Sequence, residues 1–247
     1  SFISALLNNK EGNFTFDDLI NIPQYPIRQQ FDGFLSDFSD INEIKKNWIT
    51  TQTRLNLDEK IKFLKTHHVN CKIGNDSFTN FDNTLGVIYI VRDPRNIVFP
   101  LSQSFQLSEE QSLKNLLSKT YLGKDSQSHC TTYLSSWKDH YNSWKVFTRF
   151  NKYLLIKYED LINDKELYFE KILKFISKIQ NKEFKLDDTK FRNVIKSTDF
   201  QKMKNLEENK GFFEAKKNLK TGKKIKFFNL GPKNDWKKML NKEMIKK

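Results

Sequence analysis

The stretch that most constrains the fold is an apolar run, GVIYIV at residues 86–91, that ends directly in the charged cluster RDPRN at residues 92–96. Because the run has no polar alternation, it predicts a strand buried on both faces of a parallel sheet. Pro94 and Asn96 then end the strand and begin a helix. At the carboxyl end of such a strand, where open α/β sheets bind ligands, the planar guanidinium of Arg92 suits a phosphate. The alternative is a structural arginine that forms a salt bridge with Asp93.

The rest of the chain alternates between strand-like and helix-like patterns. A short extended segment is expected at 63–68 and a second buried strand at 153–158. Helices are expected from residue 95, with Pro100 inside, and at 108–118, 165–178 and 187–196. Strands separated by helices predict an α/β fold whose parallel sheet is covered on both faces. With no internal repeat and no linker-like stretch, residues 1–247 are expected to form a single domain.

Aromatic residues supply much of the expected core. The chain has 22 Phe and 4 Trp, although only 37% of its residues are hydrophobic. Aromatic residues spaced by three and four between 129 and 147 predict one helical face directed at the core; they are Tyr133, Trp137, Tyr141, Trp144 and Phe147. Residues 1–7 are expected to be an amphipathic helix, and residues 13–38, with Pro23 and Pro26, irregular surface structure.

The positive charge is concentrated at the C-terminal end. Residues 201–247 contain 15 Lys and 5 acids, which is +10 of the net +13, and are expected to be irregular until residue 235. Such a segment can attract nucleic acid, an anionic membrane surface or a small polyanion, or it can reflect a lysine-rich composition. It has no RNA-binding aromatic signature and no helix-turn-helix pattern, which disfavours nucleic acid.

Two cysteines, Cys71 and Cys130, lie far apart without metal-ligand spacing, which predicts a reducing cytoplasm and no structural metal. No apolar run approaches the ~20 residues of a membrane span, so no span is expected.

The tripeptide Lys65-Thr66-His67 stands at the end of the 63–68 segment and carries the candidate general base. A histidine that titrates near pH ~6.5 can accept a proton, and a neighbouring ammonium can balance charge on a transferring group. A structural histidine is the alternative, because this motif is weak by itself.

Taken in order, the motifs resemble those of the sulfotransferases that use 3′-phosphoadenosine 5′-phosphosulfate (PAPS). The resemblance covers residues from about 60 to 238 and rests on KTH at 65–67, IVRDPRN at 90–96, KYED at 157–160 with EKILKF at 170–175, STDF at 197–200 before KMK at 202–204, and FFNLG at 227–231 before DWK at 235–237. It implies a three-layer α/β/α sandwich with a parallel sheet, similar to that of P-loop NTPases. It also implies PAPS as the cosubstrate, without a metal.

The resemblance also implies roles for individual residues. His67 would deprotonate the acceptor hydroxyl or amine, Lys65 would assist the sulfuryl group, and Arg92 would hold the nucleotide 3′-phosphate. The adenosine pocket would be lined by Tyr158, Thr198 and Phe200. A segment closing over the 3′-phosphate, within the basic residues 201–247, would include Phe228, Asn229 and Gly231.

Three features depart from the family pattern. Pro100 stands where a serine is usual, with Ser102 or Ser104 as substitutes, and Asn229-Leu230 stands where an Arg-Lys pair is usual, with Lys226 or Lys233 as substitutes. No P-loop occurs in the sequence. Residues 1–7 resemble the helix that follows that loop, so the sequence is expected to lack the P-loop and the first strand.

Three functions remain open at this point. The first is sulfuryl transfer from PAPS to a small-molecule or glycan acceptor, whose pocket residues 13–38 and 123–132 are expected to shape. The second is non-catalytic binding of a nucleotide or sulfated ligand on the same fold, favoured by the departures. The third is nucleic-acid binding, favoured by the basic segment alone.

Overall fold

The computed structural model describes residues 1–218 and 221–246, which form two compact units. Unit 1 comprises residues 1–21, 90–115 and 156–247, and unit 2 comprises residues 22–89 and 116–155. Of the predicted basic segment 201–247, residues 219–220 and 247 lie outside the described part. The chain passes between the units at several points, two of which are inside strands.

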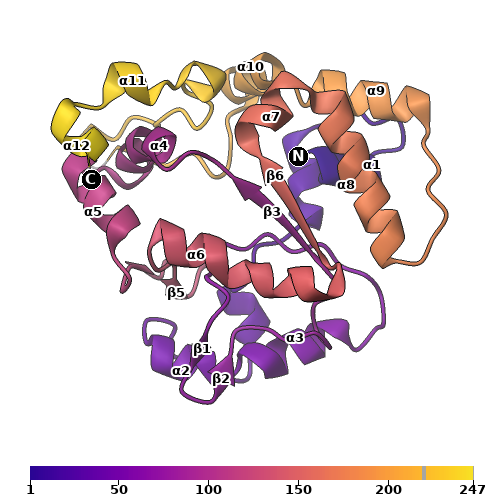
Figure 1. Cartoon of the computed structure of the whole chain (residues 1–247), viewed down its shortest axis with the longest axis horizontal. Helices are drawn as coiled ribbons and strands as arrows, with labels where there is room; N and C mark the ends of the chain where they lie inside the picture. The colour runs from indigo at the N-terminus through magenta and orange to yellow at the C-terminus, as the bar shows by residue number, and fades with distance from the viewer. Residues whose placement is uncertain (219–220, 247) are drawn as a thin grey trace. The chain divides into compact units, whose positions relative to one another are not determined.

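Two strands, β3 (Val87–Val91) and β6 (Tyr153–Lys157), lie side by side and lead into helices at their carboxyl ends (Figure 1). They are parallel, with the Val87 amide donating to the Lys152 carbonyl at the start of both strands (2.8 Å). Both strands were predicted. Burial on both faces was not confirmed, because only two strands pair in this sheet among the described residues, and Ile90 is 56% exposed.

Unit 1 is mainly helical. It contains the helices expected after each strand and further short helices near the N-terminal and C-terminal ends of the chain. The elements are α1 (Phe2–Asn8), η1 (Phe16–Asn21), α4 (Arg95–Phe105), α7 (Tyr158–Asn163), α8 (Lys165–Ile179), α9 (Asp188–Ser197), α10 (Phe200–Lys210), η4 (Gly231–Lys233), α11 (Trp236–Met239) and α12 (Lys242–Lys246). Helix α5 (Glu109–Leu117) begins in this unit. The core joins α1, α8 and α9, where the Phe2 ring stacks on Phe169 (3.7 Å) and meets Phe191 edge-on.

Unit 2 contains short elements around one aromatic core. They are η2 (Arg28–Phe31), α2 (Ile41–Lys45), α3 (Trp48–Asn56), the hairpin β1 (Lys72–Ile73) with β2 (Asp76–Ser77), the antiparallel pair β4 (Leu122–Gly123) and β5 (Thr132–Tyr133), α6 (Trp137–Ser143) and η3 (Trp144–Phe150). Trp48, Phe78, Trp144 and Phe147 are buried together at its centre.

Three expectations were wrong. Residues 13–38 contain the short helices η1 and η2 and bury Phe14, Phe16, Tyr25 and Phe31, so this range is not irregular surface structure throughout but also supplies core residues. Tyr133 is not on the aromatic helix but in strand β5, where Leu122 pairs with it.

The third wrong expectation concerns residues 201–235, which are not uniformly irregular, because α10 occupies 200–210. The Asp199 side chain caps this helix by accepting from the Gln201 amide, and Gly211, with a φ of 74°, ends it.

Candidate active site

The side chain of Arg92 lies at the carboxyl end of β3, as predicted, and is partly buried. Its guanidinium carbon is 4.4 Å from the centre of the Tyr158 ring, and its Nη2 donates to the Gly231 carbonyl (3.2 Å). Asp93 forms its salt bridge with Arg95 instead (2.6 Å). The alternative that Arg92 pairs with Asp93 is therefore wrong, and Arg92 lies among residues predicted to bind the nucleotide.

The Arg92 guanidinium retains hydrogen-bonding capacity. Its Nε is buried and lies 3.8 Å from Glu159 Oε1, which is within ion-pair range but beyond hydrogen-bond distance. Neither atom has a hydrogen-bond partner among the described residues. A buried cationic donor without a partner costs free energy that an anion can recover by binding it. This geometry suits a phosphate oxygen next to Arg92.

Tyr158, Thr198 and Phe200 each stand at a helix end in the same unit. Tyr158 begins α7, and its burial raises the pKa of the phenol above its usual value, so the hydroxyl stays protonated. Thr198 follows α9, where its buried hydroxyl donates to the Val194 carbonyl (2.7 Å). That hydroxyl can therefore only accept a hydrogen bond from a ligand. Phe200 begins α10.

Gly231 packs directly against the Phe200 ring. A Cβ at Gly231 would lie 2.3 Å from ring atoms of Phe200, and the glycine has a φ of 51°. Both facts require glycine at this position. The Phe228 ring meets Phe200 edge-on, with centroids 6.1 Å apart, whereas the Asn229 side chain is exposed. The structure thus brings Arg92, Tyr158, Phe200, Phe228 and Gly231 together through successive contacts.

Two polar side chains that the sequence analysis did not select hold the segment 227–236 in place. The carboxylate of Glu207, which is 8% exposed, accepts from the amides of Phe227 (2.7 Å) and Phe228 (2.9 Å). Asn96, at the start of α4, makes two hydrogen bonds to this segment. Its side-chain oxygen accepts from the Trp236 amide, and its main-chain carbonyl accepts from the Asn234 side chain. Asn96 could have been found from the sequence, because it directly follows the RDPR motif. No sequence feature marked Glu207, because it stands in a stretch rich in charged residues.

We expect Glu207→Gln to loosen this segment, because a side-chain amide replaces one of the two acceptor oxygens with a donor. Charge-assisted bonds of this kind are worth about 1.5–3 kcal/mol net. Hydrogen exchange at the amides of Phe227 and Phe228 should accelerate. Glu208→Gln is the matched control, since the neighbouring carboxylate is exposed and bonds Lys226 instead. Equal protection in both variants would contradict the anchoring role.

The structure also shows what the substitutes for the missing family residues do. Pro100 lies inside α4, and the buried Ser102 hydroxyl donates to the Phe99 carbonyl (2.8 Å), while Ser104 is exposed. Lys226 forms a salt bridge with Glu208 (2.7 Å), and Lys233 lies exposed in η4. Ser102 and Lys226 are therefore already engaged within the protein.

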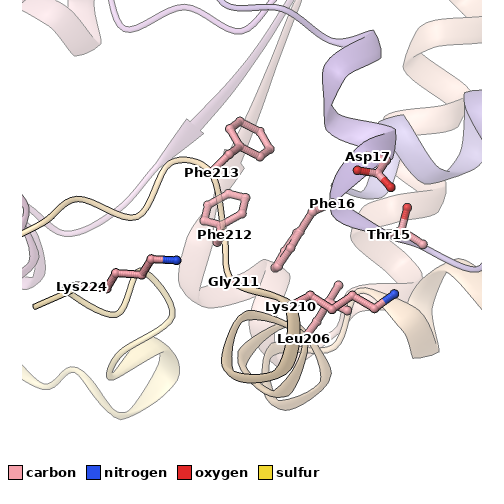
Figure 2. A pocket seen from close by; sticks show the side chains of 9 residues that line it. All are labelled: Thr15, Phe16, Asp17, Leu206, Lys210, Gly211, Phe212, Phe213 and Lys224. Carbon is pink, nitrogen blue, oxygen red and sulfur yellow. The ribbon is translucent and has the colours of Figure 1, made fainter.

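A cavity of about 390 Å³ lies in unit 1, and Figure 2 shows the side chains that line it. Its lining residues are Thr15, Phe16, Asp17, Leu206, Lys210, Gly211, Phe212, Phe213 and Lys224. The Phe16 ring is parallel to that of Phe228, with centroids 5.8 Å apart, and Phe212 contacts both rings. None of the residues predicted to bind the nucleotide lines this cavity. However, one of them, Phe228, contacts Phe16 and Phe212, which do line it.

The predicted catalytic residues, Lys65 and His67, lie in unit 2 on a segment without regular secondary structure, apart from a parallel bridge between Lys65 and Gln24. The main chain of Lys65 bonds that of Pro23 (3.0 Å) and Tyr25 (2.8 Å). The next histidine, His68, is fully buried, and its ring stacks on Phe78 at 4.0 Å. His67 is exposed, so only the first of the two histidines can meet a substrate.

The His67 ring is neutral at physiological pH. Surrounding protein withdraws water from the ring, and the Lys65 ammonium repels positive charge. Both effects lower the pKa of His67 below the ordinary histidine value of 6.5, although the residue remains accessible to solvent. A neutral imidazole is the form that can accept a proton.

The described residues contain neither a metal-binding cluster nor a membrane-spanning helix. Within 1–218 and 221–246, no group of three or more His, Cys, Asp or Glu side chains is arranged to hold a metal ion. Among the helices described here, none combines the length and apolarity needed to cross a membrane.

Sequence comparison with curated proteins finds sulfotransferases. The chain is 28% identical over 174 residues to sulfotransferase 2A6 of Mus musculus, covering 70% of this chain and 56% of that protein. It is 25% identical over 195 residues to 3-beta-hydroxysteroid sulfotransferase of Cavia porcellus, covering 77% of this chain and 62% of that protein. The chain therefore spans less than two thirds of these relatives.

Structure comparison agrees on the fold. The crystal structure of mouse sulfotransferase SULT7A1 complexed with PAP matches with a TM-score of 0.51 at 17% identity, covering 88% of this chain and 75% of that one. This likeness confirms the predicted α/β fold of the sulfotransferases. The family model described as the sulfotransferase domain matches residues 15–247. With the predicted motifs in order along the same residues, the chain belongs to the sulfotransferase domain family.

Proposed function

We propose that this protein transfers a sulfuryl group from PAPS to a hydroxyl or amine of a small-molecule or glycan acceptor. The observation that carries the proposal is the partly buried Arg92 guanidinium at the end of β3. Tyr158 lies against it, the Gly231 carbonyl accepts from its Nη2, and its Nε, 3.8 Å from the Glu159 carboxylate, makes no hydrogen bond with the described residues. An adenosine 3′-phosphate would supply the oxygen that this donor lacks.

In the proposed reaction, the acceptor oxygen or nitrogen attacks the sulfur of PAPS as the bond from sulfur to the phosphate oxygen breaks. The acceptor proton passes to His67, and adenosine 3′,5′-bisphosphate leaves. Lys65 balances charge on the transferring group. Tyr158, Thr198 and Phe200 hold the adenosine. Phe228, Asn229 and Gly231, within 201–247, close over the 3′-phosphate. His67 acts through its neutral ring, and positioning supplies the rest of the catalysis.

Residues 1–247 are proposed to act as a single catalytic domain. SULT7A1, whose fold this chain shares, was crystallised with PAP, which fits a PAPS cosubstrate. The proposed reaction requires no metal. Cys71 and Cys130 are both free thiols, which suits the cytoplasm.

The proposal is tested by comparing two nucleotides in calorimetry on the full-length gene product that carries residues 1–247. Adenosine 3′,5′-bisphosphate should bind at least about tenfold more tightly than adenosine 5′-phosphate, because one added charge-assisted bond is worth about 1.5–3 kcal/mol. Equal affinities would contradict it.

The pH dependence follows from the direction of the His67 pKa shift. A general base must be unprotonated, and a lowered pKa keeps it so at more acidic pH. We therefore expect kcat/KM to fall on the acidic side with a midpoint below pH 6.5. The measurement is a pH profile of sulfuryl transfer at fixed ionic strength. A midpoint above 6.5 would contradict the assignment.

One observation favours a second function, ligand binding without turnover. The Ser102 and Lys226 side chains, which were candidates to replace missing family residues, bond Phe99 and Glu208 instead. Under this alternative the bisphosphate binds, but labelled PAPS transfers nothing to any acceptor. Nucleic-acid binding remains disfavoured, and duplex DNA should bind weakly, with affinity falling steeply as salt rises.

A further inference from the structure

A chain of hydrogen bonds in unit 2 ends on the main chain of His67. The Tyr89 hydroxyl lies 2.7 Å from Nδ1 of His140, and Nε2 of His140 lies 3.2 Å from the His67 carbonyl oxygen. Tyr89 is in strand β3, His140 is in helix α6, and all three residues belong to the same compact unit. The strand and the helix are thereby connected to the main chain of the residue proposed as the base.

The chemistry of the acceptor atom fixes the direction of this chain. A carbonyl oxygen carries no proton, so Nε2 of His140 must be the donor to His67. Burial lowers the pKa of His140 and raises that of Tyr89, so both side chains are neutral at physiological pH. In a neutral imidazole protonated at Nε2, Nδ1 is an acceptor, and the Tyr89 hydroxyl donates to it. Tyr89 thus sets the tautomer that His140 needs.

Two residues near His67, His68 and Lys65, are held by other groups. Trp144 Nε1 donates to the His68 carbonyl (3.1 Å), and the His68 ring is buried against Phe78. On the other side, the main chain of Lys65 is bonded to residues 23 and 25. The hydrogen bond from His140 is made to the carbonyl of His67 itself. The amide of the same peptide group, on His68, donates to the Thr66 hydroxyl (3.1 Å), so the bond from His140 ties this group to helix α6 rather than to its own segment.

We propose that His140, with its tautomer set by Tyr89, is a positioning residue that fixes the His67 main chain so that the His67 ring meets the acceptor. The inference rests on the proposed function of His67 as general base. His140 itself takes no proton from the substrate. Its contribution is geometric, and a misplacement of about 1 Å at a reacting group can cost about 10²-fold in rate.

The test compares three substitutions in the full-length protein, assayed with labelled PAPS and the best acceptor of a panel. His140→Leu keeps the bulk but removes the donor, and we expect kcat to fall about 10- to 100-fold with the bisphosphate affinity unchanged. His140→Gln carries an amide N–H at similar reach and should recover most of that loss. Tyr89→Phe should lower kcat up to about tenfold, since one ordinary hydrogen bond is lost.

Tyr141→Phe is the matched control, because it removes a hydroxyl from a ring 5.9 Å from that of Tyr89 but outside the chain. It should leave kcat unchanged.

Full activity in His140→Leu, or equal losses in His140→Gln and His140→Leu, would overturn the positioning role. If His67→Ala is fully active, the proposed function fails as well. If His67→Ala is inactive while His140→Leu is active, only the positioning role fails.

A spectroscopic measurement tests the chain without any turnover. In nitrogen-15 NMR of the free protein, His140 should appear as the neutral tautomer protonated at Nε2, and Tyr89→Phe should shift its Nδ1 resonance. A tautomer protonated at Nδ1 would overturn the inference, even if the His140→Leu protein did not fold.

Discussion

His67→Ala should lower sulfuryl transfer by about 10²–10⁴-fold, which is the usual contribution of a positioned general base. Its affinity for adenosine 3′,5′-bisphosphate should not change, because His67 is proposed to contact the acceptor and not the nucleotide. The measurement is kcat with labelled PAPS, together with calorimetry of the bisphosphate.

The same variant can be rescued chemically. His67 is exposed, so its removal leaves a position that free imidazole can reach from solvent. Added imidazole should restore part of the activity, with a pH dependence that follows the pKa of imidazole. A variant that loses nucleotide affinity as much as activity would instead indicate a structural role for His67.

Arg92→Ala should weaken binding of adenosine 3′,5′-bisphosphate by about 10- to 150-fold, while binding of adenosine 5′-phosphate changes little. The expected loss corresponds to a charge-assisted bond of about 1.5–3 kcal/mol, made to the phosphate that only the first ligand carries. Calorimetry of both ligands on wild type and variant gives the comparison directly.

Arg95→Ala is the matched control for Arg92→Ala. It removes the same charge close to the same strand end, but the Arg95 side chain is bonded to Asp93 and lies 3.8 Å from the centre of the Trp236 ring. Its effect on the two nucleotides should be small and equal. A similar loss for both ligands in Arg92→Ala, with the fold intact, would contradict the assignment of the 3′-phosphate.

The sequence predicted the two parallel strands and the helices α8 and α9, because each of them is specified by residues close together in the chain. The strand at 87–91 and residues 153–156 of the second strand are continuous apolar runs. Helices α8 and α9 are capped by Asp164 and Asp187, whose carboxylates accept helix amides. Such runs and caps act over a few residues, so they can be found in a single sequence.

The misplaced elements depended on distant partners. Tyr133 has helical spacing to Trp137, but it pairs with Leu122 in a strand. Residues 13–38 have the composition of a surface loop, yet Tyr25 and Phe31 join the core of unit 2 through contacts with Phe78 and with each other. In these cases tertiary contacts outweighed the local pattern.

Some residues of the candidate site could likewise be predicted from the sequence, and others could not. Arg92 could be selected because a rare arginine follows an apolar run, and the family resemblance supplied Tyr158, Phe200 and Gly231. Glu207 could not be selected, because its neighbours in sequence are charged and its burial arises from amides twenty residues later. The role inferred for His140 likewise depends on a carbonyl 73 residues earlier.

Transfer of a labelled sulfuryl group from PAPS by this protein should be measured across a panel of phenol, steroid, amine and sugar acceptors. We expect transfer to at least one acceptor, inhibition by adenosine 3′,5′-bisphosphate, and loss of that inhibition at matched concentrations in Arg92→Ala. Transfer that is insensitive to the bisphosphate, or no transfer by a folded protein to any acceptor, would contradict the proposed function.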